Sequence, residues 1–544
     1  MAVSEDIRAL VDYACDCGLI GFEDRVWAYN AVLEAVGATG PEPGEDWVLN
    51  ETYAFPCMTA AMAGVDDLAG ERPTTSDEED FSAATFDLEG TLARLAEAAV
   101  AAGVAEDTAS GRDRAAMRVM GLIMPRPSEV VAIFEDALRC AGPHEATDWF
   151  YKMCCDAGYV RRAAIARNIA WTTPTRWGDL EITINRSKPE KDPRDIAAAG
   201  AAKPTGEKYP ACQLCIENEG YPGRSAASAA GDHPARQNLR IVPIELGGER
   251  WGLQYSPYAY FNEHCIAMSA HHRKMHIDAD ALGCLLDFVD LLPRYFIGSN
   301  ADLPIVGGSI LSHDHFQGGA HVFPMMGARE AATFEMGAFP GVSGAVLEWP
   351  LSVLRLRGTD RDEVLAAAVH VVDAWRSYSD ESVGVRAHDA DGTPHNTVTP
   401  VVRREGDGYE VYLALRCNVT SEANPLGDFH PHAEWHHIKK ENIGLIEVMG
   451  LAILPPRLVG ELAAVRGHLL AGELDALEGD PLTASHAAWA REVSEAHPEL
   501  SEDNAEDVIR DEVGRVFGHV LEDAGVFKWD AEGRAAQARF IATL

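Results

Sequence analysis

Residues 307–319 constrain the fold of this chain more than any other stretch. They read Gly-Gly-Ser-Ile-Leu-Ser-His-Asp-His-Phe-Gln-Gly-Gly, so that His313, His315 and Gln317 alternate along the segment. Side chains two positions apart on a β-strand point to the same face. We therefore expect an extended strand that presents these three side chains on one side, next to glycines whose bare backbone lets a phosphate group approach.

An imidazole in this setting suits nucleotidyl transfer. Its neutral nitrogen can attack a phosphorus atom and later leave, which divides one difficult displacement into two easier ones. The segment therefore predicts a nucleotidyl-transfer site. The alternative is an ordinary strand that happens to carry two histidines.

The His-x-His-x-Gln pattern after a Gly-Ser element resembles the histidine-triad superfamily. Its glutamine ending and its surroundings are similar to the type 2 UDP-glucose–hexose-1-phosphate uridylyltransferases. Further blocks of the chain agree with this resemblance and run in the family's order, namely residues 181–193, 258–265, 295–304 and 436–450.

The resemblance implies an α+β fold built from two histidine-triad-like half-units with antiparallel sheet, of which one retains the nucleophile. Helical additions would stand at both ends of the chain. We expect a helical domain over residues 1–145, a catalytic half over 146–335, a second half over 336–458 and a helical region over 459–544. The resemblance also implies a homodimer.

The implied reaction is a ping-pong transfer of UMP from UDP-glucose to galactose 1-phosphate through a UMP-histidine intermediate. His315 would be the nucleophile and Gln317 would donate a hydrogen bond to the phosphate, with His313 beside them. A dinucleoside or sugar-nucleotide phosphorylase of the same superfamily is one alternative. A nucleotide-binding protein without catalytic activity is the other. The sequence leaves open whether the acceptor is galactose 1-phosphate or an N-acetylhexosamine 1-phosphate.

A second histidine pair, His430 and His432, competes for the role of nucleophile. Two residues after His432 stands Glu434, whose carboxylate would repel a phosphate on the same face, whereas the neutral donor Gln317 stands two residues after His315. The sequence therefore favours His315. The second pair, with Glu434, His436 and His437, would form either a metal site or a polar cluster.

Cys212 and Cys215 have the two-residue spacing of a metal knuckle. The resemblance supplies His272 and His313 as further ligands, although His271 competes with His272 for that place. The expected cofactor is zinc or a similar divalent ion with a structural role, because four protein ligands leave no open position. Two buried free cysteines are the alternative.

Substrate contacts are expected from the family-like blocks. The resemblance points to Asn300 as a contact of the nucleotide, and Gly308 and Ser309 belong to the predicted phosphate turn. Arg240 and Lys188 supply positive charge for the phosphates of UDP-glucose and the hexose 1-phosphate.

Composition limits the partners. The chain has 544 residues, with 46 Lys and Arg against 85 Asp and Glu, for a net charge of −39. Such an acidic chain argues against nucleic acid or an anionic membrane as the main partner. The chain contains no run of about 18 apolar residues that would predict a membrane span, and its amino terminus does not resemble a secretory signal. We therefore expect a cytoplasmic protein, and the eleven cysteines fit reduced thiols better than disulfides.

Local patterns predict several elements. Alternation of apolar and polar residues predicts strands at residues 180–184, 238–243 and 265–268. It also predicts a hairpin in which Gly-Asp-Gly joins a strand at 396–402 to one at 409–415. Helical periodicity predicts a helix over residues 281–292 that leads into the histidine strand. From about residue 443 the chain is expected to return to helix, with an apolar stripe over residues 509–520 that packs on the body of the protein.

Overall fold

A computed structural model describes residues 2–40, 44–48, 86–187, 209–210, 212–228, 230–307 and 310–544. The chain forms two compact units. The first unit comprises Met1–Ala137, Ala146–Val160 and Glu190–Val242, and the second comprises Leu138–Glu145, Arg161–Pro189 and Pro243–Leu544. Both units are assembled from separate parts of the chain, and the expected division into four consecutive domains stays a prediction.

The first unit is helical in its amino-terminal part, as predicted. An apolar stripe along the first helix is fully buried, at Ile7, Leu10, Val11 and Ala14. Two of the helices begin with side-chain caps: Asp87 accepts from Gly90 N–H, and Thr108 accepts from Gly111 N–H. The helices that lie wholly or mostly in this unit are α1 (Ala2–Asp16), α2 (Arg25–Ala35), α3 (Glu45–Val48), α5 (Leu88–Ala101), α6 (Ala109–Leu122), α7 (Pro127–Cys140) and α8 (Pro143–Asp156).

The second unit is built on a ten-stranded sheet. Its order is β3-β4-β5-β7-β6-β11-β12-β10-β9-β8. The strands are β3 (Val242–Leu246), β4 (Glu249–Tyr255), β5 (Cys265–Ser269), β6 (Phe296–Gly298), β7 (His315–Gly319), β8 (Glu330–Glu335), β9 (Ser343–Leu347), β10 (Val353–Gly358), β11 (Asn396–Glu405) and β12 (Gly408–Cys417).

This sheet repeats one pattern twice. From one edge the order is β3-β4-β5-β7-β6, and from the other it is β8-β9-β10-β12-β11, so that β6 and β11 meet at the centre as an antiparallel pair. Helix α11 (Ala279–Leu291) connects β5 to β6, and α12 (Arg361–Ser377) connects β10 to β11 in the same place of the second half. The repeat supports the prediction of two related half-units in an α+β fold.

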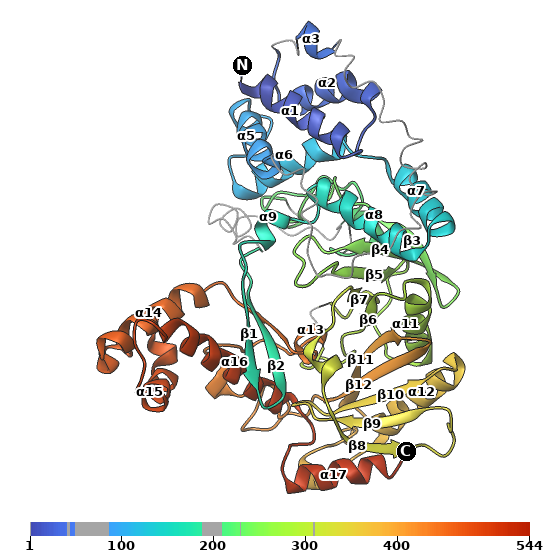
Figure 1. Ribbon diagram of the computed structural model, residues 1–544, viewed down its shortest axis with the longest axis vertical. Coiled ribbons are helices and arrows are strands. Elements are labelled where there is room, and N and C mark those ends of the chain that lie inside the picture. The colour runs from blue at the N-terminus through green and yellow to red at the C-terminus, as the bar shows by residue number, and fades with distance from the viewer. Residues whose placement is uncertain are drawn as a thin grey trace, which may run out of the picture. The chain divides into compact units, whose positions relative to one another are not determined.

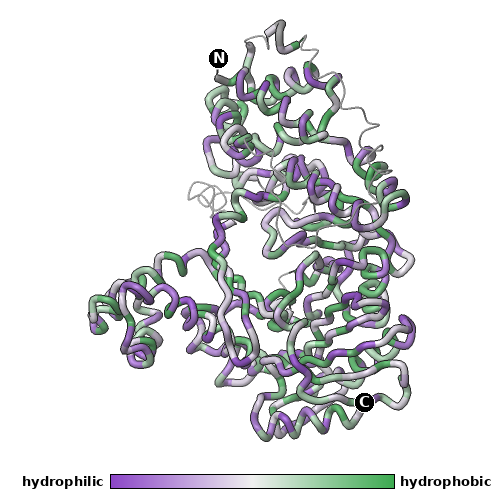
Figure 2. The backbone as a smooth tube through the Cα atoms, in the orientation of Figure 1, coloured by the Kyte–Doolittle hydropathy of each residue, from purple (hydrophilic) through white to green (hydrophobic). Residues whose placement is uncertain are grey.

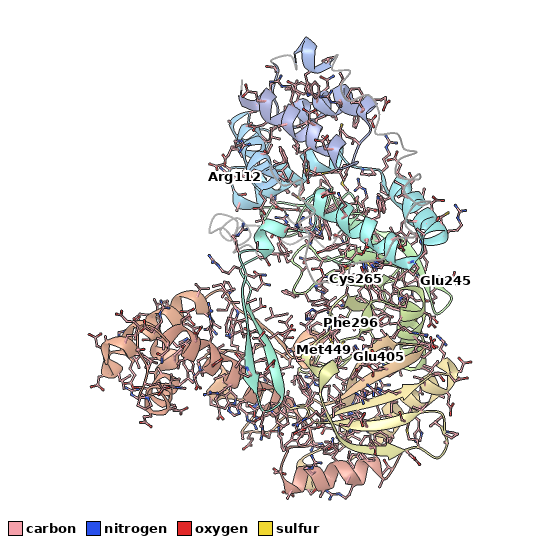
Figure 3. All side chains as sticks on the ribbon, in the orientation of Figure 1. Arg112, Glu245, Cys265, Phe296, Glu405 and Met449 are labelled. Carbon is pink, nitrogen blue, oxygen red and sulfur yellow. The ribbon has the colours of Figure 1, made fainter. Side chains whose placement is uncertain are left out.

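The two faces of the sheet have different covers. Helices α11 and α12 pack against each other and on β11 (Figure 1). On the other face, Val401 and Tyr412 belong to a large apolar core that also contains Phe296, Met449 and Phe517; Phe296 and Met449 are labelled in Figure 3. Across neighbouring strands, Gln317 of β7 pairs with Gly298 of β6, and Gly298 pairs in turn with Val401 of β11. Opposed residues share a face, so Gln317 lies on the face of this core.

The face of the ten-stranded sheet that carries the large core is covered by elements from distant parts of the sequence. A small sheet contains β1 (Ile169–Thr175), β2 (Gly178–Ile184) and β13 (Leu451–Leu454), with β13 parallel to β2. Helix α16 (Ala505–Ala524) packs on β1 and β2, and α13 (Leu445–Val448) lies against β13. Helix α14 (Leu458–Ala471) packs on α16, and α15 (Ala487–Ala496) packs on α14. Helix α17 (Ala531–Ile541) lies elsewhere, with Phe540 against Trp375 of α12, and α9 (Arg162–Ile165) precedes β1. Hydrophilic and hydrophobic residues alternate along α14, α15 and α16 (Figure 2), as expected for helices that bury one side.

Several local predictions are confirmed. Helix α11, the β11–β12 hairpin and strands β2 and β5 lie where the patterns placed them. The apolar stripe of α16 is buried in the core, as predicted, at Ile509, Val513, Val516, Phe517 and Val520. Within the described residues, no helix is both long enough and apolar enough to cross a membrane.

Three other predictions need correction. The strand expected at residues 238–243 begins only at Val242. The return to helix from residue 443 is interrupted by β13, because four apolar residues there pair with β2. The histidine strand is shorter than expected and begins at His315, so that His313 stands just before it.

Candidate active site

Strand β7 lies between two neighbours near the middle of the sheet. It pairs antiparallel with β5 on one side and with β6 on the other. Glycine at position 318 is required, because a Cβ atom there would lie 2.4 Å from the backbone oxygen of Phe296. His315 and Gln317, two positions apart on this strand, share a face as predicted.

His315 has the tautomer and protonation state of a nucleophile. Its side chain is buried, and its Nδ1 lies 2.8 Å from the backbone oxygen of His313. Because Nδ1–H donates to that oxygen, the lone pair of the neutral ring is on Nε2. Burial lowers the pKa of His315 below its ordinary value of 6.5. The imidazole is therefore uncharged near pH 7 and can attack a phosphorus atom.

Gln317 is half-buried and is held by a second histidine. Its Oε1 lies 3.1 Å from Nε2 of His264, the residue just before β5. An amide carries two N–H donors and no charge, so the Gln317 side chain can donate to an anionic oxygen without exchanging a proton.

Asn300 follows β6 and is buried on the same side of the sheet. Its Oδ1 accepts from the backbone N–H of Leu445 at 2.9 Å, at the first residue of α13. This bond fixes the start of α13. The predicted contact of Asn300 with the nucleotide stays a prediction. Gly308, Ser309 and Lys188, the other predicted contacts in family-like blocks, lie outside the described residues.

The geometry of Arg240 favours a structural role over the predicted contact with substrate. Its guanidinium is buried in the first unit. It donates to the backbone oxygens of Pro125 at 2.7 Å, Gln237 at 3.1 Å and Leu239 at 2.7 Å. A guanidinium directed at three carbonyl groups stabilises the fold around it, so we do not retain Arg240 as a phosphate ligand.

In the first unit, Cys212 and Cys215 form a compact thiol pair. The backbone N–H of Cys215 lies 3.2 Å from Sγ of Cys212, and the side chain of Asn218 donates to the backbone oxygens of both cysteines at 2.9 Å. The hydrogen bond from the Cys215 thiol lowers the pKa of Cys212 to about 6. Together with His272, these cysteines carry the donor atoms that zinc prefers.

In the second unit, His272 and His313 lie together. Their ring centroids are 4.4 Å apart, which favours His272 over His271 as the predicted partner of His313. Nε2 of His313 lies 2.9 Å from the backbone oxygen of Ser269. A histidine that binds a metal commonly donates its other ring N–H to a carbonyl group, so the orientation of His313 suits a ligand.

Comparison with known proteins shows the family of this chain. Residues 79–274 match the family model described as galactose-1-phosphate uridyl transferase, N-terminal domain, and residues 288–491 match the C-terminal domain. The galactose-1-phosphate uridylyltransferase of Bacillus subtilis is 45% identical over 542 residues, which are 99% of this chain and 98% of that protein.

The chain belongs to the galactose-1-phosphate uridylyltransferase family. It is a nucleotidyltransferase that transfers a uridylyl group. The relative from Halalkalibacterium halodurans is 43% identical over 544 residues, 100% of this chain and 99% of that protein. The relative from Lacticaseibacillus paracasei is 49% identical and covers 81% of this chain and 87% of its own length. A crystal structure of yeast Ap4A phosphorylase matches with a TM-score of 0.30 and 13% identity, over 57% of this chain and 90% of that one.

In this uridylyltransferase, the second group of histidines is bound to separate partners. His430 contacts Asn442 through Nε2, His432 contacts Asp523, and His437 contacts the backbone oxygen of Glu434. His436 contacts the backbone oxygen of Pro431. These contacts favour the polar cluster over the metal site as the interpretation of this segment.

Sequence reasoning missed two contacts at and just after the histidine strand. His264 belongs to a family-like block, but nothing in its local sequence indicates that it meets Gln317. His321 follows β7 and lies 2.9 Å from Oε2 of Glu181 on β2. The members of each pair are far apart in the sequence. Pairing of β5 with β7 brings His264 to Gln317, whereas His321 meets Glu181 across two different sheets.

Proposed function

We propose that this uridylyltransferase moves UMP from UDP-glucose to galactose 1-phosphate through a covalent UMP-His315 intermediate. The observation that carries the proposal is the buried, neutral ring of His315, whose Nδ1–H is committed to the backbone oxygen of His313. The nucleophilic lone pair is thereby assigned to Nε2. The names of the relatives support galactose 1-phosphate as the acceptor.

In the first step, Nε2 of His315 attacks the α-phosphorus of UDP-glucose, and the bond from that phosphorus to the oxygen of glucose 1-phosphate breaks. In the second step, a phosphate oxygen of galactose 1-phosphate attacks the same phosphorus, and the P–N bond breaks to release UDP-galactose and free imidazole. Both leaving groups depart without needing a proton, so no general acid is required.

Gln317 would donate its amide N–H to a non-bridging oxygen of the transferring phosphoryl group. Charge on that oxygen changes during each displacement, and an oriented donor stabilises it. An amide does not titrate, so it cannot help to activate water against the intermediate. Asn300, Gly308, Ser309 and Lys188 remain the proposed contacts of the nucleotide and phosphates.

The acceptor decides between this reaction and that of a phosphorylase. The test mixes the protein with UDP-glucose and either galactose 1-phosphate, an N-acetylhexosamine 1-phosphate or inorganic phosphate, and quantifies every nucleotide product. We expect UDP-galactose with the first acceptor and no UDP with inorganic phosphate. Release of UDP with phosphate alone, at a rate equal to sugar transfer, would identify a phosphorylase instead.

We also propose that Cys212, Cys215, His272 and His313 hold a zinc or similar divalent ion. The donor types and the hydrogen bonds of the cysteine pair and of His313 support this assignment. When bound, the ion would fix the segment that leads into β7. The chemistry of transfer would remain with His315 and Gln317.

Removal of one thiol should lower metal content and stability together. We expect Cys212→Ser to retain well below the roughly one zinc per chain of the wild type and to melt at a lower temperature, because a closed structural site contributes to folding. Cys284→Ser, which changes a buried cysteine of α11, is the matched control and should keep its metal. Metal analysis by mass spectrometry measures the first quantity. A wild type prepared without chelators that contains no stoichiometric metal would refute this site.

A further inference from the structure

His264 makes one side-chain hydrogen bond in the described part of the chain, and its partner is Gln317. The His264 ring is buried, with Nε2 at 3.1 Å from Oε1 of Gln317. Its Nδ1 is also buried and has no partner among the described residues. The only side-chain hydrogen bond that His264 makes in this part of the chain therefore constrains the orientation of Gln317, a candidate catalytic residue.

The unpartnered Nδ1 indicates which ring nitrogen carries the proton. If Nδ1 carried it, a buried N–H would have no acceptor among the described groups, and such orphan donors are rarer than unsatisfied acceptors. With the proton on Nε2, the ring donates to Oε1 of Gln317, and only a lone pair is unsatisfied. Burial lowers the pKa of His264 to about 4, so the ring is neutral near pH 7.

The position of the ring is fixed from several sides. It packs against Phe261, with ring centroids 4.5 Å apart, and against Tyr260 at 5.6 Å. The backbone oxygen of His264 accepts from Ser256 N–H at 2.8 Å. The neighbouring carboxylate of Glu263 is engaged elsewhere, with Arg294 and Tyr295. His264 is therefore a rigid and uncharged donor.

An amide group needs such a partner because its two ends have nearly the same shape and opposite polarity. With its oxygen toward the phosphoryl group, Gln317 would repel the negative oxygens there. With its nitrogen toward them, it donates two N–H groups. In the described part of the chain, the Gln317 side chain makes no hydrogen bond other than the one to His264.

We propose that His264 is a positioning residue that holds the amide oxygen of Gln317 toward the protein and thereby directs the amide nitrogen at the transferring phosphoryl group. This inference rests on the proposed role of Gln317 in uridylyl transfer. It assigns His264 no contact with substrate, and its effect on the rate should pass entirely through Gln317.

The test is a double-mutant cycle on the formation of the UMP-enzyme, with the rate from rapid quench and the dissociation constant of UDP-glucose from calorimetry. His264→Phe keeps a ring and removes the donor. We expect it to slow UMP-enzyme formation roughly 10- to 100-fold, by losing part of what one oriented donor supplies, with a smaller change in affinity. In a Gln317→Ala background the same substitution should slow the reaction less than about twofold, because no amide remains to be oriented.

Two further variants separate positioning from stability. His395→Phe changes another buried histidine of the second unit, which contacts Asn418 and Asp389, and it should lower the melting temperature without slowing transfer. His264→Gln restores an N–H donor and should recover part of the lost rate.

The outcomes distinguish the two levels of the proposal. An equal slowing by His264→Phe with and without Gln317 would overturn the positioning role, as would a full rate in His264→Phe. If Gln317→Ala itself leaves the rate unchanged, the proposed role of Gln317 fails, and the role of His264 fails with it, while uridylyl transfer through His315 is untouched.

Discussion

Strands β7 and β12 occupy the same place in the two five-strand halves of the sheet, but they carry different chemistry. Each is the last strand of its half in sequence and lies one position from the centre, as the order β5-β7-β6 and its counterpart β10-β12-β11 show. On the face of the large core, β7 presents His315 and Gln317. On that same face, β12 presents Tyr412, Ala414 and Arg416.

The two strands also differ in how burial acts on their charge. Burial keeps the imidazole of His315 neutral, since it lowers a pKa that is already below 7. Arg416 is 1% exposed, and burial lowers its pKa only to about 10, so it stays charged. Its Nη1 donates to Thr399, while its Nε has no partner among the described residues. The strand order is therefore repeated, whereas the proposed nucleophile, a neutral imidazole, occurs in one half.

The largest effect should follow from giving β7 a charge. Gln317→Glu replaces the amide donor by a carboxylate on the face of His315. The variant then has a glutamate two residues after the histidine, as the second histidine pair has with His432 and Glu434. We expect UMP-enzyme formation to slow about 10³-fold or more, against about 10²-fold for Gln317→Ala, because repulsion adds to the loss of a donor. Rapid quench of the reaction with UDP-glucose measures both rates. Equal rates in the two variants would show that charge on this face does not matter.

A smaller effect should follow from removing the charge of β12. Among the described residues Arg416 has no ion pair within 4 Å, and Glu447 attracts it only at longer range. A buried cation of this kind gains little from ion pairing, so an apolar replacement is often neutral or stabilising. We expect Arg416→Met to change the free energy of unfolding by between zero and about +2 kcal/mol. Lys439→Met is the contrast. It leaves the buried carboxylate of Glu447 without its partner at 2.9 Å and should cost about 3 kcal/mol.

Urea denaturation of the three proteins gives these free energies. A loss of stability in Arg416→Met as large as that in Lys439→Met would show that the longer-range attraction of Arg416 by Glu447 stabilises the fold as much as the direct ion pair of Lys439.

The sequence predicts those parts of the fold whose signal is local. The β11–β12 hairpin follows from alternation on both sides of Gly406 and Gly408, and α11 follows from its helical periodicity. Strand β13 could not be predicted, because its four residues also fit the end of a helix and its partner β2 is remote in the sequence. The repeat of the strand order could not be derived from the residues alone, since a short His-x-His pattern is all that the two halves share; the resemblance implied it.

The same distinction applies to the site. Alternation was enough to predict that His315 and Gln317 share a face. Sequence reasoning could not reveal that His264 meets Gln317, because that contact depends on the pairing of β5 with β7. Arg240 was assigned to substrate because it is a cation in a plausible block, and its sequence does not indicate that three carbonyl oxygens surround its guanidinium.

The central claim is that uridylyl transfer passes through His315. The intact mass of the protein after incubation with UDP-glucose, without an acceptor, tests it directly. The account predicts one added UMP in the wild type and in His432→Asn, which changes a histidine that contacts Asp523, and none in His315→Asn. An adduct that persists in His315→Asn and vanishes in His432→Asn would contradict the account.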